Sequence, residues 1–180
     1  MKRFILVLIF FVCLLCPLCA EKLETDVMKA EHDFYSKGIG LRFASAGESG
    51  IGGISYQQWF ENNLGFQGTA AFVINDYTTF YSFEAQIQKL FYVFDFGKSS
   101  TSHFFVWANV GFNSNERMYR NEDDSITYKY TPNGFAGLGF GFAVDFIGHI
   151  SIPVQFGIIC TYPKSFSVGM TSGISLLYRF

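Results

Sequence analysis

The sequence predicts an all-β fold, a closed antiparallel up-and-down transmembrane β-barrel of about eight strands, on three observations. The 180-residue chain has many aromatic side chains (19%, with 23 phenylalanines) and few charged ones (16%), whereas roughly 25% of the residues of an average soluble domain are charged. Beyond residue 20, no apolar run reaches the about 20 residues of a membrane-spanning helix. Apolar residues instead recur at every second position, which is the pattern of a strand in a membrane barrel.

The first twenty residues have the features of a cleavable signal peptide. Lys2 and Arg3 give a positive start, and the apolar stretch at 4–15 that follows is short for a membrane span. Residues 18–20 then offer a cleavage site before Glu21. Two alternatives remain open, an uncleaved membrane anchor and a lipoprotein acylated at Cys13, Cys16 or Cys19, although none of these cysteines follows the usual small residue.

Removal of residues 1–20 leaves Cys160 as the one cysteine of the mature chain, so an internal disulfide cannot form. It also removes Lys2 and Arg3, which makes the formal net charge of −2 more negative. This acidic balance gives no support for nucleic-acid binding. The composition therefore argues against a disulfide-stapled secreted fold and against a nucleic-acid-binding protein.

A polar and charged segment at 21–33 precedes the predicted barrel domain, which covers residues 34–180. Alternating runs separated by Gly, Asn, Asp and Ser predict its strands. These runs cover about 34–43, 52–60, 64–74, 80–94, 103–112, 134–146, 150–158 and 166–180. The longest break, 113–133, is rich in charged residues and is predicted to be a loop.

Side-chain size and charge indicate which face of the strands points outward. In the last three strands, one face carries large apolar residues without any charge, and the other carries mainly Gly, Ser, Thr and Gln. A soluble barrel has its large apolar residues inside, and a core of small polar residues would bury little apolar area. With the apolar face in lipid, a closed barrel pairs all of its backbone groups internally, as a bilayer requires.

The breaks between the strands alternate in kind. Those at 61–63, 97–102 and 147–149 are short or tight, and they alternate with breaks at 44–51, 75–79, 113–133 and 160–165. Outer-membrane barrels have short periplasmic turns and longer external loops. We therefore expect both termini, with segment 21–33, in the periplasm and loop 113–133 outside the cell. Aromatic residues near strand ends, Trp59 among them, predict a girdle at each interface.

Four charged residues fall on the inner face of the predicted strands. By alternation and strand direction, Arg42 and Glu84 lie in the outer half of the barrel, and Asp145 and Arg179 lie near its periplasmic end. Charges inside a membrane protein are expected to pair. We therefore predict one ionic plug at each level, which either holds the barrel shut or gates a pathway through it.

The chain ends in Gly173-Ile174-Ser175-Leu176-Leu177-Tyr178-Arg179-Phe180. This stretch resembles the C-terminal signal of the small bacterial outer-membrane β-barrel proteins, the group of outer membrane proteins A, X and W. The resemblance to that group covers about residues 34–180. The resemblance implies that barrel-assembly machinery reads Gly173, Leu176, Tyr178 and Phe180. It also implies a monomer in the cell outer membrane, in contact with lipid and lipopolysaccharide.

The sequence offers little for catalysis, a cofactor or a metal. His103 and His149 are predicted to lie at periplasmic turns near Ser102 and Ser151, without the local His-Ser motif expected from a resemblance to lipid A deacylase barrels. We expect no catalytic, cofactor-binding or metal-binding residue. The leading hypothesis is a non-enzymatic structural or surface-interaction protein acting through loop 113–133. A narrow channel for small or hydrophobic solutes, resembling outer membrane protein W, is the alternative, and a lipid A-modifying enzyme is the third.

Overall fold

The computed structural model describes residues 36–46, 49–60, 63–75, 78–95, 100–120, 126–146, 149–162 and 167–180. The predicted signal peptide at 1–20 and the predicted segment at 21–33 lie outside these residues. In the part of the chain that is described, no helix is long and apolar enough to cross a membrane.

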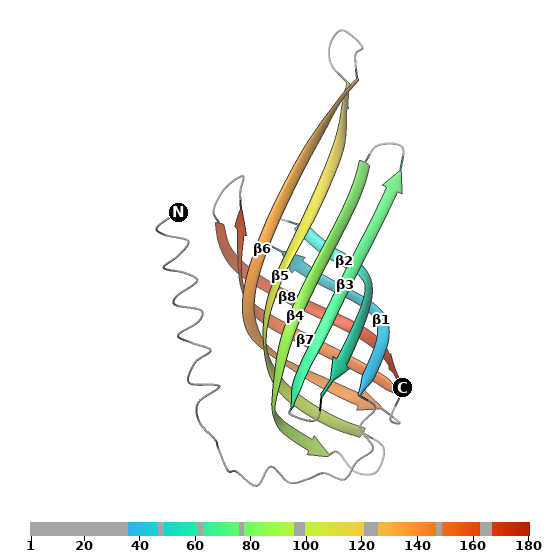
Figure 1. The fold of residues 1–180 in the computed structure, drawn as a ribbon, viewed down its shortest axis with the longest axis vertical. Coiled ribbons are helices and arrows are strands. Elements are labelled where there is room, and N and C mark those ends of the chain that lie inside the picture. Colours follow the sequence, from blue (N-terminus) through green and yellow to red (C-terminus); the bar gives the residue numbers. More distant parts are fainter. Residues whose placement is uncertain are drawn as a thin grey trace. The chain divides into compact units, whose positions relative to one another are not determined.

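Eight strands form one closed barrel, in which each strand pairs antiparallel with the next and β1 pairs with β8 (Figure 1). Their bounds are Lys37–Ala46 (β1), Ser49–Trp59 (β2), Leu64–Asn75 (β3), Thr78–Asp95 (β4), Ser100–Arg120 (β5), Ile126–Phe146 (β6), Ile150–Tyr162 (β7) and Ser167–Arg179 (β8). The predicted fold class, a closed up-and-down barrel of eight antiparallel strands, is confirmed. We call the end of the barrel at which β1 begins and β8 ends the terminal end. The opposite end, where the β5–β6 hairpin extends, is the hairpin end.

The wall of the barrel is uneven in height. Strands β5 and β6 have 21 residues each and stay paired as far as Arg120↔Ile126, whereas β1 has 10 residues and β2 has 11. Figure 1 shows the β5–β6 hairpin rising beyond its neighbours. The prediction of a loop over 113–133 was therefore wrong, because only 121–125 separate the two strands. Backbone pairing in a hairpin needs no apolar side chains, so the polar sequence resembled a loop.

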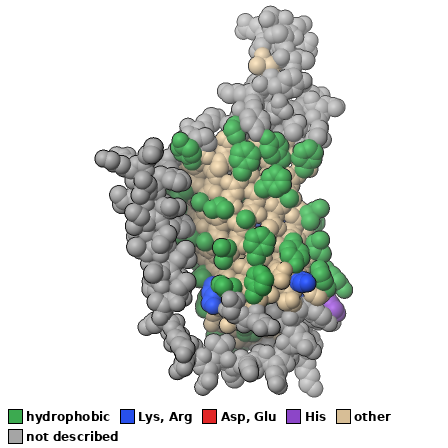
Figure 2. All heavy atoms as spheres, in the orientation of Figure 1, with side chains coloured by type: hydrophobic (Ala, Val, Ile, Leu, Met, Phe, Trp, Pro, Cys, Tyr) green, Lys and Arg blue, Asp and Glu red, His purple; other side chains and the backbone are tan. Residues whose placement is uncertain are grey.

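Outward-facing side chains are apolar around the whole barrel. Leu41, Phe72, Ile87, Val110 and Leu176, from five different strands, all have at least half of their surface exposed. Figure 2 shows hydrophobic side chains spread over one face of the barrel, with Lys and Arg side chains near its lower edge. Inward-facing residues are mostly polar and buried. This arrangement is the inverse of a soluble barrel and is the one that lipid favours.

The β2–β3 connection shows how the sequence makes a tight turn. Asn63 has a φ of 60°, a left-handed conformation that Asn adopts more readily than most residues. Its N–H donates to the carbonyl of Phe60 at 3.1 Å, and its own carbonyl accepts the N–H of Leu90 at 2.9 Å. Asn63, the last residue of the predicted tight turn at 61–63, thus bonds to β4.

Candidate functional site

The barrel interior is the candidate site because it gathers buried polar and charged side chains from all eight strands. Five glutamines, each at most 1% exposed, lie at its centre: Gln57, Gln67, Gln86, Gln88 and Gln155. Gln88 donates to Oε1 of Gln67 at 2.8 Å and accepts from Nε2 of Gln57 at 2.6 Å. Gln155 donates to Oε1 of Gln86 at 3.0 Å and to Oε1 of Gln67 at 3.3 Å. These bonds join β2, β3, β4 and β7 across the lumen.

An ion pair lies on the hairpin-end side of the glutamines. Arg42 on β1 and Glu84 on β4 meet through two bonds of 3.1 Å, from Nε to Oε2 and from Nη2 to Oε1. Nδ2 of Asn109 donates to Oε1 of Glu84 at 2.7 Å, and Nη1 of Arg42 donates to Oε1 of Gln155 at 2.7 Å. A bidentate arginine–carboxylate pair fixes both distance and orientation. Because both side chains are buried, the pair braces β1 against β4.

A second charged cluster lies near the terminal end. Oδ2 of Asp145 on β6 lies 3.3 Å from Nδ1 of His103 on β5, and Oδ1 of Asp145 lies 3.8 Å from Nε of Arg179 on β8. Nη2 of Arg179 also donates to Oγ of Ser151 on β7 at 3.0 Å. The cluster therefore links four consecutive strands, including the last strand of the sequence.

Aromatic rings fill the lumen between the two charged levels. Trp59, Phe105, Trp107 and Ala143 are buried together. Trp59 meets Phe105 edge to face with ring centroids 5.9 Å apart, a favourable arrangement for aromatic pairs. The indole N–H of Trp107 donates to the carbonyl of Phe140 at 3.1 Å. These rings leave little room for a passage.

Inward-facing glycines make room for the two indoles. A Cβ atom added to Gly139 or to Gly157 would lie 2.7 or 2.6 Å from Cζ2 of Trp107, and one added to Gly65 would lie 2.6 Å from Cε3 of Trp59. Real side chains do not approach so closely. The glycine-rich inner face of β6 is therefore complementary to the large inward residues of β5.

An apolar pair lies in the interior beside the level of Glu84. Phe135 on β6 and Ile159 on β7 are buried in contact with each other. The ring of Phe135 lies against Gly111, where a Cβ atom would collide with it. The lumen thus holds a charged cluster near the terminal end, aromatic rings, glutamines, an ion pair and an apolar pair.

The four charged residues singled out in the sequence all lie inside the barrel, each at most 7% exposed. The structure brings Arg42 to Glu84 at one level and Arg179 to Asp145 at the other. Sequence reasoning missed His103, which it placed at a turn. His103 is fully buried inside β5, since that strand begins at Ser100.

Trp59 is a second correction. The sequence placed it in the aromatic girdle at the membrane interface, but its ring faces inward, 5.7 Å from the ring of His103. The alternation along β2 could have predicted this inward direction, because Trp59 lies two residues beyond Gln57 and four beyond Ser55, which both face inward. Its size and its place at a strand end suggested the girdle instead.

The C-terminal residues close the barrel. Leu176, Tyr178 and Phe180 point outward and are more than half exposed, whereas Gly173 is half-buried between β1 and β7. The N–H of Phe180 donates to the carbonyl of Lys37 at 2.9 Å. His149 stacks on Tyr178 with centroids 5.6 Å apart, and its Nδ1 lies 3.1 Å from the carbonyl oxygen of Arg179.

Within the described ranges, no three His, Cys, Asp or Glu side chains are grouped so that they could hold a metal ion. The buried cluster of His103 and Asp145 lies inside a packed lumen. The polar groups of the interior bond mainly to one another, so the arrangement suits bracing and closure.

A closed eight-stranded antiparallel barrel with an apolar exterior and a polar interior is the architecture of transmembrane barrels. No family model matches the chain, and no curated protein matches it in sequence. Among solved structures, the N-terminal β-barrel domain of Pseudomonas aeruginosa OprF is similar, with a TM-score of 0.50, 11% identity and coverage of 81% of this chain and 98% of that one. This likeness shows a shared fold.

Two further structures match over most of their length with lower TM-scores. Neisserial surface protein A has a TM-score of 0.37 and 14% identity, with 79% of this chain and 92% of that one covered. The attachment invasion locus protein Ail of Yersinia pestis has a TM-score of 0.34 and 14% identity, with 80% and 95% covered.

Proposed function

We propose that the protein is an integral β-barrel of the bacterial outer membrane with a structural or surface-interaction role and no enzymatic activity. One observation carries the proposal: on the described strands the outward-facing residues are predominantly apolar, while most charges and amides are enclosed. Such an exterior would aggregate in water, and its closed strands leave no open sheet edge in lipid. A signal peptide at 1–20 would bring the chain out of the cytoplasm.

The β5–β6 hairpin is the part that we assign to surface interaction. It extends beyond the short wall formed by β7, β8, β1 and β2 (Figure 1). With both termini in the periplasm, this hairpin would lie outside the cell, on a monomer surrounded by lipid and lipopolysaccharide. The outward series Leu176, Tyr178 and Phe180 would serve the assembly machinery before the barrel closes.

The filled lumen favours a closed barrel over the alternative of a narrow solute channel. The Arg42–Glu84 pair, the glutamines and the rings of Trp59 and Trp107 all lie buried in the interior. Eight strands leave an interior only wide enough for side chains. A lipid A-modifying enzyme would need a base open to the membrane, and His103 is fully buried.

Heat modifiability of the protein in fractionated membranes tests the proposal. A folded membrane barrel in the outer-membrane fraction should migrate faster in a gel before boiling than after it. An epitope inserted between Arg120 and Ile126 should be accessible to antibody on intact cells. A soluble periplasmic protein whose mobility does not change on boiling would refute the proposal, and an epitope exposed only in lysed cells would reverse the orientation.

A further inference from the structure

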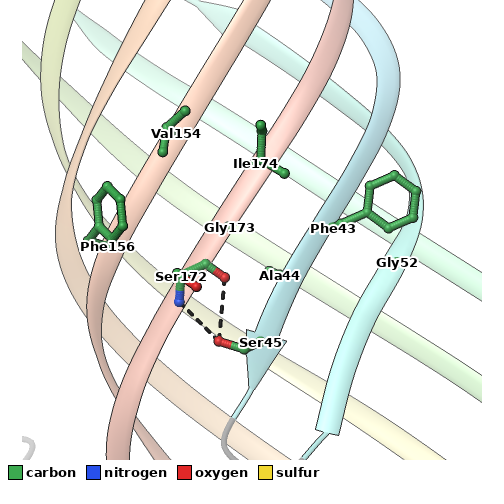
Figure 3. A pocket seen from close by; sticks show the side chains of 9 residues that line it. All are labelled: Phe43, Ala44, Ser45, Gly52, Val154, Phe156, Ser172, Gly173 and Ile174. Carbon is green, nitrogen blue, oxygen red and sulfur yellow. Dashed lines mark hydrogen bonds between the residues drawn. The ribbon is translucent and has the colours of Figure 1, made fainter.

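A recess that the interior network does not use lies on the outer surface of the barrel. It has a volume of about 560 Å³ and lies across β7, β8, β1 and β2. Sites for small molecules commonly have about 300–1,000 Å³. Phe156 and Phe43 stand on its two sides, Val154 and Ile174 lie at one end, and Ser45 and Ser172 lie at the other (Figure 3).

Backbone forms the floor of the recess. Gly173 and Ala44, whose neighbours in sequence face outward, are directed into the barrel and present only their backbone to the recess. At its side, Gly52 lets the ring of Phe43 lean over β2, because a Cβ atom there would lie 3.1 Å from Cδ1 of that ring. The side chains that border the recess are therefore mostly large and apolar, and the surface between them lies lower.

The backbone under the recess is satisfied without a ligand. The paired register of β1 and β8 ends at Ala44↔Gly173. At the next position, the Ser45 hydroxyl accepts the N–H of Ser172 at 3.0 Å and donates to the carbonyl of Ser172 at 3.5 Å. Both bonds use the backbone of Ser172, and the side chain of Ser172 itself points outward and is exposed.

We infer that this recess holds one acyl chain of a bilayer lipid, with the carbonyl of the chain at the Ser172 hydroxyl. The inference rests on the proposed membrane function, since the recess opens on the same apolar surface that would face lipid. Phe43, Ile174 and Phe156, which border it, are each more than two-fifths exposed on that surface. Ser45 lies one residue from the end of β1, so the hydroxyl end is the end nearer the rim.

Closer packing is the reason that we expect an acyl chain to prefer the recess to other parts of the surface. Within a bilayer, a chain gains no hydrophobic free energy by leaving other lipid, and only closer van der Waals contact and a hydrogen bond distinguish one site from another. A recess between two aromatic rings offers a seated chain contact with both rings and with the backbone beneath it. A chain seated there should be retained longer than its neighbours.

Photochemical labelling tests the inference. The full chain is refolded in phosphatidylcholine vesicles that contain a trace of a phospholipid with a diazirine in mid-chain. Light releases dinitrogen and leaves a carbene, which inserts into the nearest C–H bond, and mass spectrometry locates the adduct. We expect about fivefold more adduct on the recess than on the opposite wall, because the free energy of a few added carbon contacts corresponds to about that ratio. The recess is represented by Phe43, Phe156 and Ile174, and the opposite wall by Phe83, Ile87 and Val110.

A matched pair of variants keeps the inference falsifiable. Ser172→Leu fills the recess and leaves the backbone bonds to Ser45 in place, so labelling at the recess should fall to the level of the opposite wall. Ala85→Leu places the same side chain on the outward face of β4 and should change nothing at the recess. Heat-modifiability gels check that both variants fold.

The outcomes separate the two proposals. Equal labelling of both walls in a folded barrel would overturn the acyl-chain site and leave the membrane proposal standing. No adduct at Phe43 and Phe156 beside normal labelling of the opposite wall, in a protein that a bifunctional reagent cross-links into dimers, would overturn it in favour of a dimer contact. An exterior without any adduct, accessible instead to water-soluble reagents, would show that the membrane proposal itself had failed.

Discussion

The two charged levels inside the barrel both pair buried charges, but they do so with different geometry. At the hairpin-end level, the Glu84 carboxylate receives three short bonds, two from Arg42 and one from Asn109. At the terminal level, Asp145 is shared between His103 at 3.3 Å and Arg179 at 3.8 Å. The first arrangement fixes one pair tightly across the lumen. The second spreads a looser attraction over four neighbouring strands.

The difference matters because the two arginines, which both keep their charge under ordinary conditions, depend on their carboxylates to different degrees. Arg42 makes two bonds of 3.1 Å to Glu84, and loss of Glu84 would leave its charge buried without that partner. Arg179 lies 3.8 Å from Asp145, and loss of Asp145 would leave it still bonded to Ser151. We expect the hairpin-end level to be the more sensitive of the two.

Glu84→Ala should have the largest effect on stability. Breaking a buried ion pair on one side costs about 3–5 kcal/mol because an uncompensated charge remains. Urea unfolding of the refolded protein in detergent micelles, followed by tryptophan fluorescence, measures this loss. The double variant Arg42→Met/Glu84→Met is the control and should recover most of it. A double variant as unstable as Glu84→Ala would contradict the explanation.

Asp145→Asn should destabilise the barrel less, by about 1–3 kcal/mol, which is the cost of leaving buried polar groups poorly partnered. The side chain keeps its size and can still bond through its amide oxygen. The same unfolding measurement applies, with Asp145→Ala as the more severe comparison. If Asp145→Asn were as damaging as Glu84→Ala, the terminal level would be the main brace and our ranking would be reversed.

Deletion of Phe180 should cost about 0.5–1.5 kcal/mol of folded stability, the contribution of one hydrogen bond, here its N–H to the carbonyl of Lys37. Its larger effect should be on insertion in cells, if the assembly machinery reads this residue. The ratio of folded to unfolded protein in outer-membrane fractions measures insertion, and refolding in micelles measures stability. A deletion that lowered both equally would argue against a separate role as a signal.

Conductance should change least. The glutamines and the rings of Trp59 and Trp107 still fill the lumen when Glu84 is removed. We expect near-zero current in planar lipid bilayers for both the wild-type protein and Glu84→Ala. A current that appeared only in Glu84→Ala would show that the Arg42–Glu84 pair is a gate, and would favour the channel alternative.

Much of this arrangement could be predicted from alternation along single strands. The alternation of residues between the two faces of a strand was sufficient to place Arg42 and Glu84 on the inner face. The same alternation predicted the fold class. It could not give the partners, because contact across the lumen depends on register and stagger around the whole barrel. Asn109 and Gln155 are bonded to the pair for that reason, and no local pattern identifies them.

The errors arose where a strand end was judged from polarity. The start of β5 was placed at residue 103, so His103 was taken for a turn residue, whereas the strand begins at Ser100. The charged run at 113–133 was taken for a loop for the same reason. In a membrane barrel, the apolar face ends where the lipid ends, but the hydrogen-bonded ladder can continue beyond it.

Cysteine scanning along β6 tests the central claim most directly, that the apolar face meets lipid and the polar face is enclosed. In a Cys160→Ala background, single cysteines at successive positions from Phe135 to Phe146 carry a fluorophore, and brominated lipids quench it. The account predicts strong quenching at Ala136, Leu138, Phe140, Phe142 and Val144. It predicts weak quenching at Phe135, Gly137, Gly139, Gly141 and Ala143 wherever the barrel still folds. Quenching without a period of two, or strongest at the second set, would contradict it.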